Sequence, residues 1–148
     1  MGSAERTFRG SAMLNLTKAI FSKASPSTFL TYINGRLYKG RAPADAEYPY
    51  AVYSLITDVP EKTFSEDYEN VIIQFSLFSI TSSTLEIESM LTHLKTLYDE
   101  CEFNITDATL VWMKRDNVVF QVEEHTTPAG TAQVWAYHVD YSILESLD

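Results

Sequence analysis

The chain has little of what several functional classes require. Its 148 residues include one cysteine, five glycines and five prolines. A single cysteine excludes an internal disulfide framework and a cysteine-based zinc cluster. The scattered glycines form neither phosphate-binding pattern, G-x-x-x-x-G-K-[ST] or G-x-G-x-x-G. No apolar run approaches the ~20 residues of a membrane-spanning helix, and no secretory leader precedes a cleavage site.

Basic residues are also few, because 11 Lys and Arg stand against 20 Asp and Glu, for a formal net charge of −9. A protein that grips nucleic acid along one face needs concentrated Lys and Arg, so this balance argues against such binding. What the chain does have is 45% hydrophobic residues, enough for a real core. We therefore expect a soluble, intracellularly made protein with one globular domain.

The charges are unevenly placed along the chain. Residues 1–41 carry seven basic groups and one acid, which gives +6 and leaves −15 on the remainder. Complementary ends of this kind can attract copies of the same chain, and Arg36, Lys39 and Arg41 are then candidate subunit-interface residues. A fluctuation among solvated charges explains the distribution equally well.

The periodicity of apolar residues predicts the elements of the fold. Met1-Gly2-Ser3 is typical of an expression tag, so we expect residues 1–11 to be tag-derived or disordered, ahead of one domain over residues 12–148. Three- and four-residue spacing predicts helices, and alternation predicts strands. The expected helices are 11–24, a short turn or helix at Thr28–Ile33, and Thr84–Cys101; the expected strands are Tyr48–Ile56, Val71–Ile80, Ala108–Arg115, Val118–Glu123 and Thr131–Ile143.

Two local signals refine this prediction. Ser83-Thr84-Leu85-Glu86 fits a capping box at the start of the long helix, and Asp116-Asn117 is typical of a tight turn. The order of elements predicts an α+β fold, with a mainly antiparallel sheet of about five strands and two helices packed on one face.

A long acidic loop is expected between the first two strands, over Thr57–Asn70. Loops of that length inside a compact domain are usually functional or mobile. Its aromatic residues, stranded among acids, favour a protein interface over a core role. The residues of interest in it are Asp58, Glu61, Phe64, Glu66, Asp67, Tyr68 and Glu69.

Catalytic interpretations have little support. Cys101 falls on the apolar stripe of the long helix, where an inert buried thiol is the simpler interpretation. His138 and Asp140 share one face of the last strand, and Glu123 and His125 could join them in a metal site if the strands pair in register. No zinc-type ligand spacing supports that site, so a satisfied polar pair is favoured. We identify no active site and expect no cofactor or metal.

The order of elements, together with Gly35-Arg36-Leu37-Tyr38 and Ala42-Pro43…Tyr48-Pro49-Tyr50 before the first strand, resembles the tail completion or tail terminator proteins of long-tailed (siphovirus-type) phages. The likeness covers roughly residues 12–145 and rests on packing and turn residues. It implies an α+β protein that is not an enzyme. It also implies copies that close into a hexameric ring, which caps the tail tube, ends its polymerisation and offers a surface to the head-side connector.

On that basis we expect a virion or prophage structural protein in the phage tail, assembled in the host cytoplasm. Its partners would be itself, the tail tube protein and the head-side connector; DNA would pass through without specific binding, and no membrane would be involved. The acidic loop would line the lumen or contact the tube. Three alternatives stay open: a head-completion or neck adaptor ring, a monomeric acidic module that mimics nucleic acid, and a small metal-assisted hydrolase using His125, His138 and Asp140.

Overall fold

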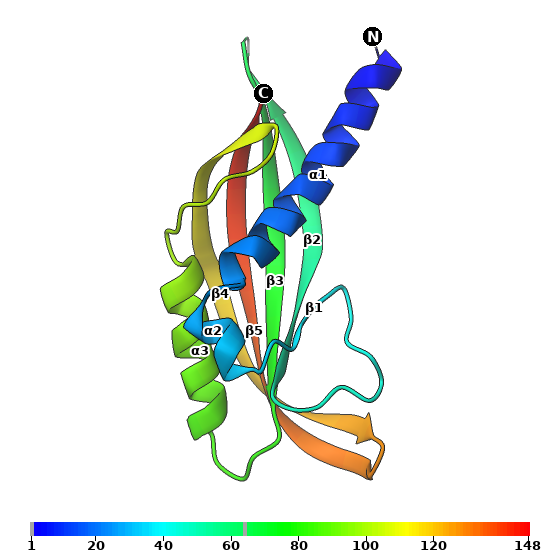
Figure 1. The fold of residues 1–148 in the computed structure, drawn as a ribbon, viewed down its shortest axis with the longest axis vertical. Helices are drawn as coiled ribbons and strands as arrows, with labels where there is room; N and C mark the ends of the chain where they lie inside the picture. The colour runs from blue at the N-terminus through cyan, green and yellow to red at the C-terminus, as the bar shows by residue number, and fades with distance from the viewer. Residues whose placement is uncertain (1, 64) are drawn as a thin grey trace.

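Helices and strands follow one another in an α+β arrangement (Figure 1). The computed structural model describes residues 2–63 and 65–148, with side chains from Met13 onward within those ranges. In chain order the elements are α1 (Gly2–Ala24), α2 (Thr28–Tyr32), β1 (Leu37–Lys39), β2 (Tyr50–Lys62), β3 (Asp67–Ser79), α3 (Leu85–Tyr98), β4 (Ala108–Thr127) and β5 (Gly130–Leu147).

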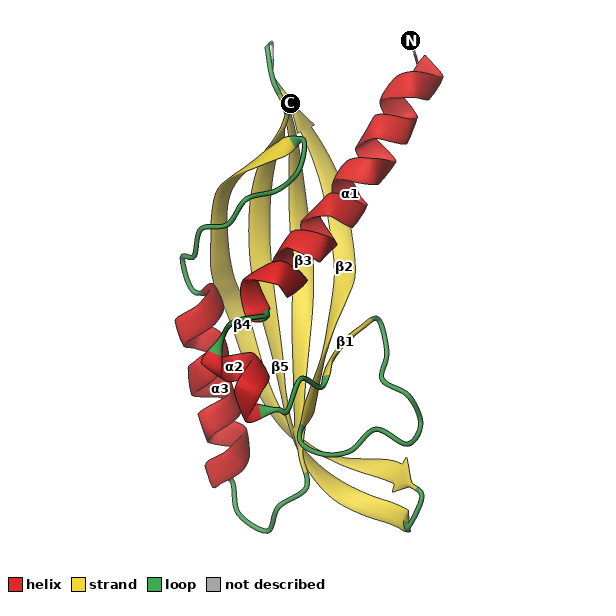
Figure 2. Ribbon diagram, viewed as in Figure 1, coloured by secondary structure: helices red, strands yellow, loops and turns green. Residues whose placement is uncertain are grey.

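The strands form one mixed sheet in the order β1-β2-β3-β5-β4. Only β1 and β2 run parallel, and the other three pairs are antiparallel. All three helices lie on the same face of this sheet (Figure 2). The predicted fold class, a mainly antiparallel sheet with helices on one face, is therefore confirmed.

The main core lies between the helices and the sheet, because alternate strand residues point toward the helices. On β5 these are the odd-numbered residues, as the sequence predicted. The buried residues include Leu16, Ile20, Phe29, Tyr53, Ile73, Phe75, Leu77, Leu94, Tyr98, Met113, Val139, Tyr141 and Ile143. A second, smaller cluster on the opposite face contains Tyr50, Val52, Phe78, Val134 and Ala136, and the segment 38–48 packs against it.

The first helices differ from the prediction mainly in their bounds. Helix α1 begins at Gly2, nine residues before the periodicity indicated, so it includes residues that the sequence set apart from the fold. That residues 1–11 are tag-derived stays a prediction. Helix α2 is confirmed: Ser27 Oγ caps it by accepting from the Leu30 amide, and the chain leaves through Asn34 and Gly35, both with positive φ.

The predicted acidic loop Thr57–Asn70 is wrong as secondary structure. Strands β2 and β3 stay paired from Tyr50↔Phe78 to Lys62↔Asp67, with one irregularity near Leu55. The segment is therefore the end of a long hairpin, in which β3 stays paired with β5 as far as Asp67↔Leu147, and only the short tip extends past the sheet (Figure 1). Acidic, solvated residues looked like a loop, but backbone pairing does not depend on side-chain polarity.

The turn predicted at Asp116-Asn117 is also wrong. Strand β4 runs through it from Ala108 to Thr127, and the pairing with β5 shifts by one residue between Arg115 and Asn117. A β-bulge takes up the extra residue without reversing the chain. The real reversal comes at residues 128–129, so two of the expected strands are one, and the fifth strand is the three-residue β1.

Helix α3 is shorter than predicted and lacks the capping box. It spans Leu85–Tyr98, and its N-cap residue Thr84 makes no side-chain capping bond. The Thr84 hydroxyl donates instead to the Glu88 carboxylate, and Glu86 accepts from Ser79 Oγ at 2.7 Å. Glu86 thus ties the helix to the end of β3 rather than closing its own first turn.

Candidate functional site

The outer end of the β2–β3 hairpin carries the acidic residues that the sequence singled out. Thr63 closes its tip, because its amide donates to the Glu66 carbonyl at 2.9 Å and its hydroxyl accepts from the Glu66 amide at 3.1 Å. Tyr68 donates to the Glu66 carboxylate, and Asn70 Nδ2 donates to Glu61 at 3.4 Å. Phe64, also predicted here, lies outside the described residues.

The pairing register distributes these acids over both faces of the hairpin. Asp58 lies opposite Val71, a core residue, so it belongs to the helix-facing side. Glu69 and Asp67 lie on that side too, because they follow the same alternation, whereas Glu61 and Tyr68 occupy the other side. The hairpin therefore presents negative charge in two directions, and Glu69 is the one acid among these that is buried.

The three predicted interface cations have different roles within the chain. Arg36 donates to the carbonyls of Pro49 and Tyr48 at 3.0 and 3.2 Å and holds the approach to β2 in place. Lys39 Nζ donates to Thr17 Oγ1 at 2.9 Å and ties β1 to α1. Within the described residues, Arg41 is the cation of the three without an ion pair or hydrogen bond, and it lines a cavity.

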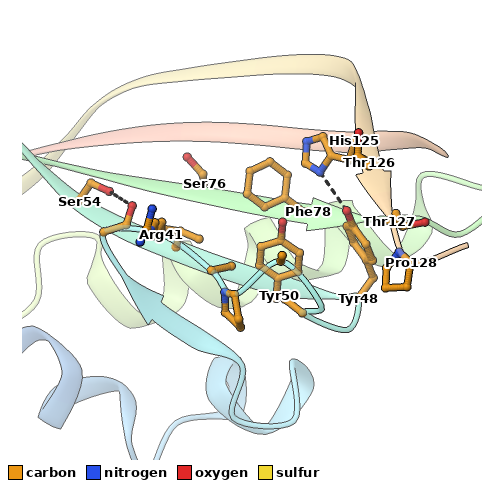
Figure 3. Close-up of a pocket in the computed structure, with 16 residues that line it drawn as sticks. Arg41, Tyr48, Tyr50, Ser54, Ser76, Phe78, His125, Thr126, Thr127 and Pro128 are labelled. Atoms are coloured by element: carbon orange, nitrogen blue, oxygen red, sulfur yellow. Dashed lines mark hydrogen bonds between the residues drawn. The ribbon is translucent and has the colours of Figure 1, made fainter. Parts of the chain in front are cut away.

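That cavity, of about 530 Å³, lies on the sheet face away from the helices (Figure 3). The segment 40–48 forms one wall, the end of the β4–β5 hairpin forms another, and the sheet forms the floor. Tyr48 reaches across, and its hydroxyl is 2.9 Å from His125 Nδ1. The lining of the cavity includes small and aromatic residues, which are Gly40, Ala42, Pro43, Ala44, Ala46, Tyr48, Tyr50, Val52, Phe78 and Pro128, and its polar members are Arg41, Ser54, Ser76, His125, Thr126 and Thr127.

Glu123 joins two histidines beside this cavity. Its carboxylate accepts from Nε2 of His125 at 2.9 Å and from Nε2 of His138 at 2.6 Å. Burial opposes ionisation of Glu123, but the two imidazole hydrogen bonds outweigh it and lower the pKa of the carboxyl. Ser76 Oγ lies 2.8 Å from Nδ1 of His138, so both ring nitrogens of both histidines have partners.

Glu123, His125 and His138 lie together in the structure, as the sequence suggested. Hydrogen bonds from the two imidazoles to the Glu123 carboxylate join them into a network. Asp140 pairs with Gln74 Nε2 at 2.9 Å rather than joining them. Over the described ranges, no group of three or more His, Cys, Asp or Glu is placed to hold a metal ion. Burial raises the pKa of the Cys101 thiol, which keeps it protonated and poorly nucleophilic at neutral pH.

One buried acid was missed. Glu145 is fully buried on the helix-facing side of β5, and neither of its carboxylate oxygens has a hydrogen-bond partner. The signal was available, because Glu145 follows Ile143 by two residues and continues the same apolar face. Glu145 lies opposite Glu69 on β3 and two strands from Asp58 on β2, so it places another acid beside the acidic end of the hairpin.

Comparison with known proteins identifies the class. The family model for "Tail completion protein gp17" matches residues 18–138. Among solved structures, a chain from a "Virion of native gene transfer agent (GTA) particle" superposes with a TM-score of 0.70 at 10% identity, covering 90% of this chain and 97% of that one, which is a likeness of fold. No curated protein matches the chain. None of the described helices is long and apolar enough to cross a membrane.

These findings define a structural protein of the phage tail. The family match covers most of the domain, residues 18–138, and the fold is α+β. The chain belongs to the tail completion protein gp17 family. The resemblance expected from the order of elements is therefore confirmed.

Proposed function

We propose that this protein is a non-enzymatic ring that closes the phage tail. Copies of the chain assemble head to tail, cap the finished tail tube, stop its polymerisation and present a joining surface to the head-side connector. The ring, which we expect to be a hexamer, assembles in the host cytoplasm and stays in the virion. Membership of the tail completion family over residues 18–138 carries this proposal.

The shape of the chain supports this role. A head-to-tail ring needs two different and complementary patches on every subunit. The sheet has two outer edges, one formed by β1 and the rest of β2 and the other by β4, and the segment with Arg36, Lys39 and Arg41 lies at the β1 part of the first. The turn that joins β2 to β3 extends past the end of the sheet, so it is free to reach a second protein (Figure 1).

We assign the acidic hairpin to the lumen or to the contact with the tube. Duplex DNA carries one negative charge per ~1.7 Å, so a lumen lined by acids repels it and lets it pass. Each copy contributes a formal charge of −9, and the hairpin segment 57–70 carries five acids against one cation, Lys62. The residues assigned are Asp58, Glu61, Phe64, Glu66, Asp67, Tyr68 and Glu69.

Ring formation is tested on the wild-type chain. We expect light scattering at increasing concentration, alone and with purified tail tubes, to report a discrete oligomer, and negative-stain images to show rings at one tube end. The neck-adaptor alternative predicts rings that bind the connector but never the tube. A monomer at every concentration, with no particle on the tube ends, would contradict the ring.

Neutralising the hairpin should separate assembly from tail joining. We expect Asp58→Asn, Glu61→Gln, Glu66→Gln and Asp67→Asn together to reduce infectious particles at least tenfold in a complementation assay, while thermal unfolding changes little. The matched control replaces four exposed acids elsewhere, Asp45, Glu100, Glu102 and Asp107, by their amides. Equal virion yields from the two variants would remove the hairpin from this role.

A further inference from the structure

The outer edge of β4 is open where the strand passes its bulge. In the described part of the sheet β4 has one neighbour, β5, so its other side pairs with no strand. On the N-terminal side of the bulge, the Met113 carbonyl accepts from the Glu100 amide, so the edge is covered there. On the C-terminal side of the bulge, the exposed apolar side chains are Val119 at 38%, Phe120 at 44% and Val122 at 54%. No proline or Lys interrupts residues 117–124. Glu123, Glu124 and the bulge at 115–117 bound this stretch, and the apolar edge between them is a template for another strand.

The direction of the free backbone groups follows from the hairpin. Thr127 and Gly130 flank a two-residue turn, and in such a turn the flanking pair exchanges both backbone hydrogen bonds. The register is continuous from there back to Asn117, so odd-numbered residues face β5. The amides and carbonyls of Val118 and Phe120 therefore point outward, away from the sheet.

The other end of the sheet has a second edge at the same level, where the Leu37 amide already donates to the Gly35 carbonyl at 2.9 Å. Strand β1 pairs with β2 alone, through Leu37↔Ala51 and Lys39↔Tyr53. Followed across the sheet through β3 and β5, these rows reach Phe120 and Val118 on β4. A rotation about an axis along the strands would therefore bring β1 of one copy level with residues 118–120 of the next.

We propose that β1 of one copy adds to the open edge of β4 in the next copy and continues the sheet across the subunit boundary. This inference rests on the proposed ring and names its interface. Because β1 and β2 run one way and β4 the other, the added pair is antiparallel, the commoner arrangement. The contact joins two different edges, so it is heterologous and repeats around a ring.

The charges beside the two edges agree with this pairing. Arg41 lies two residues beyond Lys39, and Asp116 lies two residues before Val118, so the antiparallel register brings them to one level. Both side chains are exposed, and neither has an ion pair or hydrogen bond within the described residues. The nearby cation Arg115 is already paired with Asp99 at 3.1 Å and does not compete.

A proline at position 120 tests the backbone pairing. Phe120→Pro removes an amide that points outward and leaves the bonds to β5 in place, which edge strands tolerate. We expect it to weaken self-association at least tenfold by light scattering, with circular dichroism unchanged. Phe120→Thr is the matched control, because it also loses the ring yet keeps the amide, and it should associate within about threefold of wild type. Equal association of all three proteins would overturn the proposal.

A charge exchange tests the partner and stays informative if the proline variant unfolds. Arg41→Asp and Asp116→Arg should each weaken association at least fivefold, and the double variant should regain wild-type association. If both single variants associate weakly and the double variant does not regain wild-type association, this register is excluded. If wild type never forms a ring, the proposed function fails; if rings persist in Phe120→Pro and both charge variants, only the edge pairing fails.

Discussion

Replacing Tyr98 by alanine is expected to lower the free energy of unfolding by about 3–5 kcal/mol. Tyr98 is fully buried near the end of α3, and its ring packs against Phe75 and Tyr141 with centroid distances of 4.7 and 6.1 Å. Its hydroxyl donates to the Ile20 carbonyl of α1 at 2.7 Å. One side chain therefore joins the two long helices to the centre of the sheet.

The contributions of ring and hydroxyl can be separated. Tyr98→Phe keeps the packing but leaves the buried Ile20 carbonyl without this donor, so we expect a loss of about 1–2 kcal/mol. Tyr32, which is 36% exposed, provides a matched control: Tyr32→Ala should cost less than about 1 kcal/mol. Urea unfolding followed by circular dichroism measures all three. A Tyr98→Ala variant as stable as Tyr32→Ala would show that the helices are not held through this residue.

The sequence predicted well where packing alone decides the structure. The alternation on the last strand correctly placed Val139, Tyr141 and Ile143 in the core. The stripe of Ile87, Met90, Leu91 and Leu94 correctly predicted the buried face of α3. Burial of an apolar face is a local property of spacing, so it can be derived from one sequence.

Prediction failed where backbone pairing overrides side-chain character. The acidic composition of the β2–β3 hairpin suggested a loop, yet the ladder continues to Lys62↔Asp67, and Pro60 is accommodated because β2 is an edge strand there. Asp116-Asn117 looked like a turn because a bulge and a turn use similar residues. Whether an extra residue reverses the chain depends on the partner strand, which the local sequence does not contain.

The candidate site was predicted in part for the same reason. Glu123 and His125 alternate on one face of β4, but His138 lies opposite Val119, four residues along from Glu123, so their contact also depends on how far the two side chains reach along the strands. The contact of Tyr48 with His125 could not be anticipated, because it depends on how the irregular segment before β2 folds back across the sheet. The cavity beside Tyr48 also depends on how this segment folds back, because the segment forms one of its walls.

Glu145→Gln is expected to stabilise the protein at high pH. Glu145 is fully buried on β5, and the residues opposite it are Glu69 on β3 and Leu110 on β4. Burial, and then the negative charge of Asp58, raise the pKa of the carboxyl from 4.5 to about 7. At pH 8 the native chain must therefore hold a buried carboxylate without a hydrogen-bond donor.

The sign of the pH dependence follows from proton linkage. Between pH 4.5 and 7 the native state binds more protons at Glu145 than the unfolded state does, so stability falls as the pH rises through this range. Glutamine keeps the shape but cannot ionise. We expect Glu145→Gln to raise the free energy of unfolding by about 2 kcal/mol at pH 8 and to change it little at pH 4.5.

Urea unfolding of wild type and variant from pH 4.5 to 8 measures the difference directly. Glu102→Gln, at an exposed acid in the α3–β4 connection, should show no such pH-dependent gain. A gain for Glu145→Gln that is the same at every pH would mean that the buried carboxyl stays neutral and that the amide stabilises by packing. A loss at pH 8 would mean that the carboxylate is compensated in the native chain and would contradict the prediction.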